Sequence, residues 1–365
     1  MKKMIDKVLL KNIIDEAAVD AVIITDPYSL RYYTGFRGGE GVALFSKDSY
    51  VLITDSRYTE AAGMESEFEV KEFGAKVPMK DILTEFMKSN EVHKLGFESL
   101  SISYNDYKKY EKMFSEGDFE YAPIELVPME RTLLKPREVK TAEEIELLRQ
   151  AEHIGDLAFN DILGILKPGM TELEVAAEIE YSMKRHGASG FSFDTIAASG
   201  VHSSMPHAIP SSKKLESGDF LTMDFGCLYE GYCSDMTRTV CIGKASDEMK
   251  AVYNKVLEAQ LAVLEKVKPG LVCKDVDSIA RGIIADAGYG SNFGHGLGHS
   301  VGLFIHESPA FNTRDESVLE AGMVITDEPG IYIPGRFGVR IEDMILITED
   351  GCEVLSKSPK ELIEL

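Results

Sequence analysis

Short apolar runs alternate with amphipathic segments along the first part of the chain. Residues 20–25, 41–46 and 50–54 are rich in Val, Ile, Leu and Phe, which is typical of buried strands. Apolar residues in 80–88 recur with the period of a helix instead. Strands that alternate with helices predict a small α/β domain over residues 1–125.

A different pattern follows this first domain. Residues 126–140 hold two prolines and several charged residues, which predicts a connector. A long helix is expected to begin after Thr141, because Thr141 and Glu144 have the spacing of a capping box and apolar residues then recur near one face. Residues 141–365 are therefore predicted to form a second domain.

The second domain contains an internal repeat with an offset of 101 residues. The tripeptide Lys-Pro-Gly at 167–169 recurs at 268–270, and the same offset relates Gly187 to Gly288. In both copies a helix leads into Lys-Pro-Gly, and a second helix follows that ends at the glycine. Helix-stop chemistry can produce short repeats by chance, but the shared spacing favours two related α/β halves.

Carboxylates interrupt apolar strands in both halves. The hairpin predicted at residues 223–239 has a turn that carries Glu230-Gly231, and centring this turn between Tyr229 and Glu230 places Asp224 directly opposite Asp235. Like charges opposed on a sheet are destabilising. A pair of opposed carboxylates therefore indicates a positively charged partner, and a divalent metal ion is the simplest such partner.

A second hairpin repeats this arrangement. Its turn at Pro334-Gly335 places Glu328 opposite Glu342, although Pro329 cannot donate to a strand ladder and weakens this register. Carboxylates in strands that look buried are rarely left unpaired. The alternative is that both pairs lie on solvated faces, where screening makes the repulsion small.

Composition narrows the classes of partner. The formal net charge of −22 and the pI of about 4.8 argue against nucleic acid and anionic membrane, since both reward a basic surface. No segment approaches the roughly 18 apolar residues of a transmembrane helix. Charges interrupt the N-terminus before a signal sequence can form, and the five cysteines show no metal-binding spacing. A cytoplasmic protein with reduced cysteines is expected.

Four segments carry a resemblance to a known family: MDFGCLYEGYCSDMTRT from Met223, GHGLGHSVGLFIHE from Gly294, DEPGIY from Asp327 and VRIED from Val339. With these segments in order, the sequence resembles the pita-bread metallopeptidases, and within them the prolidase and aminopeptidase P branch. The resemblance covers the whole chain. It implies an α/β (α+β) fold with an N-terminal creatinase-type domain at 1–125, a linker at 126–140, and a pita-bread catalytic domain with a pseudo-twofold repeat at 141–365.

The resemblance also implies a dinuclear metal site. Its five ligands would be Asp224, Asp235, His299, Glu328 and Glu342. Asp235 and Glu342 would bridge two ions, Asp224 would hold one ion, and His299 with Glu328 would hold the other. Oxygen ligands with one imidazole suit Mn²⁺, the ion we expect, and also Co²⁺, Zn²⁺ or Fe²⁺. Two divalent ions neutralise four carboxylates, whereas one ion leaves a buried negative surplus.

Amide hydrolysis is the chemistry expected of such a site. Two ions roughly 3.5 Å apart share a water, lower its pKa and polarise a substrate carbonyl. Glu328 is expected to carry the proton from the nucleophile to the leaving nitrogen. By resemblance, the other contacts come from His207 and His306, which bind substrate and intermediate, and from the pocket residues His295, Tyr332 and Arg340.

The resemblance implies an exopeptidase that cleaves between an N-terminal residue and proline, on dipeptides or on longer peptides. A dipeptidase must bind a free carboxylate, for which Arg340 or Arg336 is available. One alternative is a methionine aminopeptidase, which normally lacks so long an N-terminal domain. The other is a metal-free or non-catalytic binding protein of the same fold. Members of this branch commonly form homodimers, so a homodimer is expected.

Overall fold

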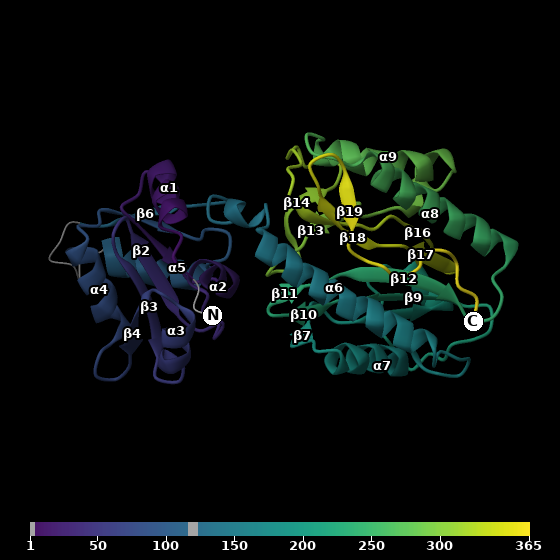
Figure 1. Ribbon diagram of the computed structural model, residues 1–365, viewed down its shortest axis with the longest axis horizontal. Coiled ribbons are helices and arrows are strands. Elements are labelled where there is room, and N and C mark those ends of the chain that lie inside the picture. The colour runs from purple at the N-terminus through teal and green to yellow at the C-terminus, as the bar shows by residue number, and fades with distance from the viewer. Residues whose placement is uncertain (1–3, 116–122) are drawn as a thin grey trace. The chain divides into compact units, whose positions relative to one another are not determined.

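The computed structural model of the chain describes residues 4–115 and 123–365 (Figure 1). The chain divides into two compact units, Met1–Arg137 and Glu138–Leu365. Both units combine helices with β-sheets, as the sequence pattern predicts. None of the helices in the described residues has both the length and the apolar character needed to cross a membrane.

A six-stranded mixed sheet forms the N-terminal unit, in the order β4-β3-β2-β1-β5-β6. Its strands are β1 (Ala21–Ile24), β2 (Val42–Ser46), β3 (Tyr50–Asp55), β4 (Glu69–Phe73), β5 (Lys94–Phe97) and β6 (Glu125–Pro128). Its helices are α1 (Lys7–Ala17), α2 (Pro27–Thr34), α3 (Thr59–Glu65), α4 (Met79–Ser89) and α5 (Tyr104–Ser115), with a 3₁₀ turn, η1, at Lys135–Arg137. Strands β1 to β3 and helix α4 lie where the apolar pattern predicts them.

The central strand of this sheet is buried on both faces. Val22 and Ile24 pack into one apolar cluster, while Ala21 and Ile23 pack into another. Successive side chains of a strand point to opposite faces, so a strand covered on both sides reads as a continuous apolar run. At the edge of the sheet, β6 pairs in parallel with β5, and this strand overlaps the predicted connector.

Two helix pairs cover the C-terminal unit. They are α6 (Ala142–Leu163) with α7 (Glu172–Arg185), and α8 (Asp247–Lys266) with α9 (Cys273–Asp286). The predicted capping box at Thr141 and Glu144 is present at the start of α6, and Thr171 forms a second one at the start of α7. Short 3₁₀ turns occur at η2 (Gly200–Ser204) and η3 (Gly290–Asn292).

The strands of the C-terminal unit form four sheets. Their orders are β11-β10-β7, β12-β9-β8, β14-β13-β15-β18-β19 and β16-β17. The strands are β7 (Gly190–Phe191), β8 (Ile196–Ser199), β9 (Phe220–Phe225), β10 (Cys227–Tyr229), β11 (Tyr232–Cys233), β12 (Met236–Cys241), β13 (Gly298–Ser300), β14 (Glu307–Phe311), β15 (Val324–Asp327), β16 (Gly330–Ile333), β17 (Phe337–Arg340), β18 (Asp343–Ile347) and β19 (Cys352–Val354).

The internal repeat predicted from the sequence is confirmed. Helices α7 and α9 begin at Glu172 and Cys273 and end at Arg185 and Asp286, an offset of 101 at both ends. One apolar cluster packs α6 and α7 against β9 and β12, and another packs α8 and α9 against β15 and β18 (Figure 1). Each half therefore has its own core of two helices on a sheet.

The first hairpin register is wrong by two residues. Asp224 on β9 lies opposite Thr237 on β12, not opposite Asp235. The turn falls at Glu230-Gly231, where both residues have positive φ angles of 45° and 78°, as the favoured two-residue hairpin turn requires. A shift of two residues keeps a side chain on the same face, so Asp235 remains a diagonal neighbour of Asp224.

The second hairpin register is confirmed. Strand β15 pairs Asp327 with Asp343, and β16 pairs Gly330 with Arg340. Both pairings belong to the single register that places Glu328 opposite Glu342. The strands are interrupted around Pro329, as its missing N–H predicts, but the register continues beyond it.

Candidate metal centre

A pocket of about 680 Å³ opens in the C-terminal unit, which is within the size range of small-ligand sites. Its lining includes nine residues singled out from the sequence: Asp224, Asp235, His299, Glu328, Glu342, His207, His295, His306 and Arg340. Tyr332 lies behind the lining and hydrogen-bonds to His295 and Arg340. The structure therefore brings the predicted residues together in one place.

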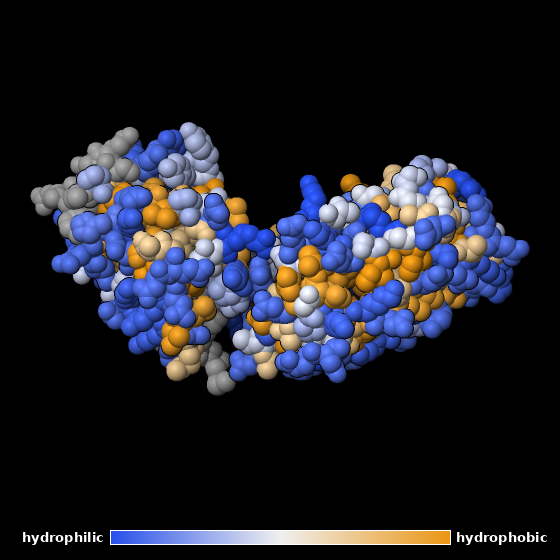
Figure 2. Space-filling model, turned by 90° about the horizontal axis from the view of Figure 1, so that it is seen from above, coloured by the Kyte–Doolittle hydropathy of each residue, from blue (hydrophilic) through white to orange (hydrophobic). Residues whose placement is uncertain are grey.

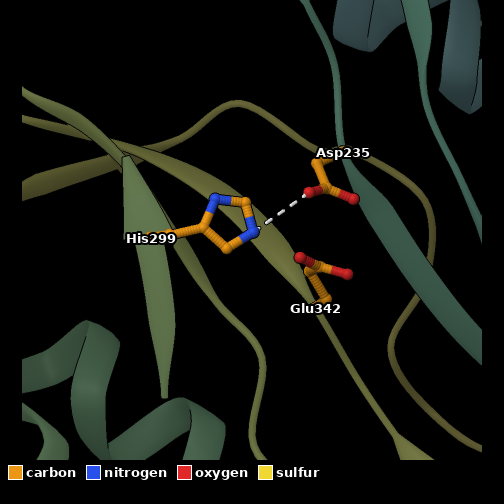
Figure 3. Close-up of side chains that lie close together, drawn as sticks. All are labelled: Asp235, His299 and Glu342. Atoms are coloured by element: carbon orange, nitrogen blue, oxygen red, sulfur yellow. Dashed lines mark ion pairs between the residues drawn. The ribbon is translucent and has the colours of Figure 1, made fainter. Parts of the chain in front are cut away.

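Three side chains form the centre of this group. Ligand atoms of Asp235, His299 and Glu342 all lie within 4.8 Å of one another. Figure 3 shows the His299 ring pointing toward the two carboxylates, with its Nε2 atom 3.5 Å from Asp235 Oδ2. The same nitrogen is 3.6 Å from Glu328 Oε1. Carboxylate oxygens and one imidazole at this spacing are suitable ligands for a divalent transition metal.

The two halves of the repeat supply different ligands. Asp224 lies in β9 and Asp235 directly precedes β12, so both aspartates come from the first half. His299 lies in β13, Glu328 follows β15 and Glu342 precedes β18, so these three come from the second half. The site therefore exists only when both halves fold and pack together.

Burial and mutual repulsion shift the carboxyl groups toward the protonated form. Burial raises the pKa of Glu328 to about 8. Burial and, to a smaller extent, the charge of Glu342 raise the pKa of Asp235. Burial and, to a smaller extent, the charge of Glu328 raise the pKa of Glu342. Raised pKa values mean that these carboxyl groups resist ionisation when no cation is present. A bound cation would displace their protons and stabilise the carboxylates.

Asp224 is held by an arginine on one side and open on the other. Arg340 donates from Nη2 to Asp224 Oδ2, from Nη1 to the Tyr332 hydroxyl at 2.8 Å, and from Nε to Thr237 Oγ1 at 2.9 Å. The buried Asp224 Oδ1 has no hydrogen-bond partner among the described residues, which fits a metal ligand. Thr237 in turn donates to Glu342 Oε2 at 2.6 Å.

The histidines of the pocket fall into two groups. His295 donates from Nδ1 to the Gly296 carbonyl at 2.7 Å, and its Nε2 accepts from the Tyr332 hydroxyl at 2.9 Å. Both of its ring nitrogens are therefore used within the chain, and burial, with Arg340 nearby, lowers its pKa to about 4. The ring nitrogens of His207 and His306 make no hydrogen bond within the described part of the chain, and both residues line the pocket.

His299 is neutral at physiological pH. Burial, followed by the charge of His306, lowers its pKa to about 4. The rings of His299 and His306 pack edge to face, with centroids 4.5 Å apart. A neutral imidazole keeps a lone pair free for a metal.

Neither arginine named from the sequence is free to bind a substrate carboxylate. Arg340 is buried and bound to Asp224, and Arg336 pairs with Glu248 and does not line the pocket. Arg314 lines the pocket instead, and its guanidinium has no partner among the described residues. Sequence reasoning missed Arg314 because it lies in a loop without a recognisable motif.

A buried network beside the two glutamates was also missed. Asp343 accepts hydrogen bonds from Arg238 and Gln260 at 2.7 Å, and from Lys360. Asp327 lies opposite Asp343, and neither of its carboxylate oxygens has a partner among the described residues. Burial, followed by the Asp343 charge, raises the pKa of Asp327. The register that pairs Glu328 with Glu342 also pairs these two aspartates, so the signal was present in the sequence.

Two repeated α/β halves that combine acidic strands and a histidine in one pocket define a metal-dependent hydrolase. Residues 146–349 match the model of metallopeptidase family M24, and residues 9–139 match the creatinase/prolidase N-terminal domain. The chain belongs to metallopeptidase family M24. The resemblance seen in the sequence and the peptidase class are thereby confirmed.

Similar proteins extend over the whole chain. The Xaa-Pro dipeptidase of Pyrococcus furiosus is 40% identical, and the match covers 100% of both chains. The structure of the Xaa-Pro dipeptidase from Bacillus anthracis is similar with a TM-score of 0.93 and 43% identity, covering 98% of this chain and 99% of that one. The X-Pro aminopeptidase from Thermotoga maritima has a TM-score of 0.90 and 39% identity, covering 99% and 100%.

The glycine before His299 is expected to be essential. An alanine Cβ at Gly298 would lie 1.9 Å from the Thr326 carbonyl oxygen, whereas one at Gly294 would meet nothing within 4 Å. Gly298→Ala should therefore destabilise the protein by about 1–3 kcal/mol and weaken metal binding through the displaced His299. Thermal unfolding and metal content per chain measure both effects, with Gly294→Ala as the matched control. Equal behaviour of the two variants would contradict this account.

Removal of metal should make stability depend on pH above neutrality. Because the folded-state pKa values of Asp235, Glu328 and Glu342 are raised, the metal-free folded protein binds more protons than the unfolded chain. Its stability should fall as pH rises toward about 8, the pKa of Glu328. The lowered pKa values of His295 and His299 act in the opposite direction only below their ordinary value of 6.5.

Between pH 6.5 and 8 the buried carboxyl groups dominate this pH dependence. Burial also raises the pKa of Glu152 to about 8, so the part of the change that added metal reverses reports on the site carboxylates. Chelator-treated protein should unfold at a lower temperature at pH 8 than at pH 6.5, and added Mn²⁺ should raise the midpoint more at pH 8. Scanning calorimetry in buffers of equal ionic strength is the measurement. A midpoint that stays constant or rises across this window would show that the carboxylates are not held in repulsion.

Proposed function

We propose that this protein is a dinuclear-metal exopeptidase that hydrolyses the bond between an N-terminal residue and proline. The observation that carries the proposal is the convergence of four carboxylates and neutral His299 in one pocket of a family M24 chain. The names of its relatives, Xaa-Pro dipeptidase and X-Pro aminopeptidase, support the choice of substrate.

We assign the five ligands to two ions. Asp235 and Glu342 would bridge them, Asp224 would hold one ion, and His299 with Glu328 would hold the other. This donor set suits Mn²⁺ best in our proposal, and Co²⁺, Zn²⁺ and Fe²⁺ are compatible with it. When bound, the ions would supply a deprotonated water at neutral pH and polarise the scissile carbonyl.

Arg340 changes the charge balance that the ligands alone suggest. Its guanidinium lies on Asp224 and adds one positive charge to the site. Two divalent ions with four carboxylates and Arg340 leave one positive charge in excess. That excess favours hydroxide over neutral water as the nucleophile.

The remaining steps are assigned to side chains of the pocket. Glu328 would accept the proton of the attacking water and pass it to the leaving nitrogen. His207 and His306 would donate from their ring nitrogens to the substrate carbonyl and to the oxyanion that develops from it. The Tyr332 hydroxyl and Arg340 would keep Asp224 in place.

Two charged residues of the lining support a dipeptide as the substrate. Arg314 and Asp194 line the same pocket, and neither side chain has a partner among the described residues. A dipeptide carries one carboxylate and one ammonium group close to the scissile bond. Arg314 would bind the carboxylate of proline, and Asp194 would pair with the free amine. This arrangement favours a dipeptidase over an enzyme that prefers longer peptides.

Two further properties are part of the proposal. The acidic pI of about 4.8 and five free cysteines support a cytoplasmic location. A homodimer follows from the family resemblance, and neither nucleic acid nor membrane is expected as a partner of so acidic a chain. Sedimentation at micromolar concentration tests the dimer without involving the chemistry.

Hydrolysis assays test the reaction. Purified protein with Mn²⁺ should release alanine from Ala-Pro, and chelation should abolish this release because the nucleophile depends on the ions. Ala-Ala should be a poor substrate, and a peptide that begins with Met-Ala tests for a methionine aminopeptidase. Activity on Met-Ala but not on Ala-Pro would refute the proposal. Fewer than one bound ion per chain after supplementation with Mn²⁺ would favour a metal-free binding protein.

Paired substrates test the role of Arg314. Replacing Arg314 with glutamine should raise KM for Ala-Pro by roughly tenfold, the loss of one exposed charge-assisted contact, with kcat nearly unchanged. Hydrolysis of Ala-Pro amide, which lacks the carboxylate, should change little. Arg336→Gln removes an arginine outside the pocket and serves as the control. Equal losses on both substrates would show that Arg314 does not bind the carboxylate.

A further inference from the structure

The segment at residues 199–211 borders the pocket and carries His207. Its large apolar side chains do not anchor it, because Val201, Met205 and Ile209 are 50%, 49% and 86% exposed. Figure 2 shows that hydrophobic residues also gather on the visible face of the C-terminal unit. A segment that buries so little apolar surface needs polar contacts to hold one conformation.

Glu172, the first residue of α7, provides these contacts from a buried position. Its Oε1 accepts from the backbone N–H of Ser199 at 2.8 Å, from the Ser199 hydroxyl at 2.9 Å, and from His202 Nδ1 at 3.0 Å. Its Oε2 accepts from the backbone N–H of Ser211 at 3.1 Å and from the Ser211 hydroxyl at 2.7 Å. One oxygen thus binds the start of the segment, and the other binds its end.

The carboxylate is well suited to remain charged in this place. Burial raises the pKa of Glu172, but the donors from Ser211, Ser199 and His202 outweigh burial and hold that pKa below its usual value. The N-terminal end of α7 adds a favourable dipole. Charge-assisted hydrogen bonds of this kind are stronger than neutral ones.

Neighbouring contacts extend the same anchor. Lys213 donates from Nζ to the Ser199 hydroxyl and to Asp219 Oδ2, both at 2.8 Å. Within the segment, Ser203 Oγ accepts from the backbone N–H of Gly338 in β17 at 2.9 Å. The segment is therefore tied to α7 at both ends and to the sheet beside Arg340 in its middle.

We propose that Glu172 is a positioning residue that clamps both ends of the 199–211 segment and thereby places His207 over the metal centre. The inference rests on the proposed role of His207 in the reaction. Nothing in the geometry brings Glu172 into contact with the substrate, since it does not line the pocket. Its effect on catalysis must therefore pass through the segment.

A double-mutant cycle tests this inference. Glu172→Gln keeps the size of the side chain but directs an amide group toward donors that need an acceptor. In the otherwise unchanged enzyme it should lower kcat/KM on Ala-Pro by tenfold to a hundredfold. In a His207→Ala background the same change should cost less than threefold, because the residue that Glu172 positions is already absent. Bound metal per chain should stay the same in all four proteins.

The matched control is Glu174→Gln, two residues along the same helix. Glu174 accepts from the backbone N–H of Thr171 in the capping box and does not contact the segment. It should leave kcat/KM unchanged. Hydrogen exchange provides a readout that does not depend on activity: amides in 200–211 should exchange faster in Glu172→Gln, while those of β9 and β12 keep their protection. Ser211→Ala, which removes the hydroxyl contact at one end but keeps the backbone N–H contact there, should have a smaller effect of the same kind.

The outcomes separate the two proposals. Equal kinetic losses in both backgrounds, or faster exchange throughout the C-terminal unit, would overturn the positioning role and leave a general loss of stability. Wild-type protein that cleaves no Xaa-Pro substrate with Mn²⁺ would refute the proposed function instead. The exchange experiment would then still decide whether Glu172 orders the segment.

Discussion

The structure depends on keeping several carboxylates close together in a place where they are largely removed from water. Asp235, Glu328 and Glu342 all have raised pKa values because burial and their mutual repulsion oppose ionisation. Such a cluster is stable only with protons or cations between its members. Peptide hydrolysis at neutral pH requires the cations, because a protonated cluster neither binds metal nor activates water. The pocket is therefore a source of strain in the metal-free fold and becomes favourable when metal binds.

The surroundings of the cluster are arranged to fix the carboxylates without satisfying them completely. Arg340 takes one oxygen of Asp224 and leaves the other without a partner among the described residues. Thr237 takes one oxygen of Glu342. Behind them, Asp343 accepts from Arg238, a buried arginine that also binds the backbone carbonyl of Glu342. Arg340, Thr237 and Arg238 thus support the carboxylates from behind. The carboxylate oxygens that these residues do not bind remain available for an ion.

The four carboxylates of this site could be predicted from the strand pattern, because a strand period of two tolerates an error of two residues, whereas the histidines of the pocket were assigned by the family resemblance. The first hairpin turn is centred on Glu230-Gly231, one residue later than the predicted register assumed, and Glu230 adopts a positive φ there that is uncommon for a residue other than glycine. The resulting register shift of two residues is even, so Asp224 and Asp235 stay on one face and the inferred metal site survived the wrong register. The second register was correct because Pro334-Gly335 marked its turn. Loop residues such as Arg314 carry no periodic signal, and only folding places them in the pocket.

In both halves of the C-terminal unit, a buried carboxylate on a helix holds a loop that carries a histidine of the pocket. Loops at the rim of the pocket cannot be held by a hydrophobic core, because packing over them would close the opening. In the first half, buried Glu172 on α7 binds the segment that carries His207 directly. In the second half, buried Asp277 on α9 accepts from the backbone N–H of Leu297 and from Arg281, which donates to the His295 carbonyl at 2.7 Å. A carboxylate on the corresponding helix anchors a histidine loop in each half, so the pocket keeps its shape while it remains open to substrate.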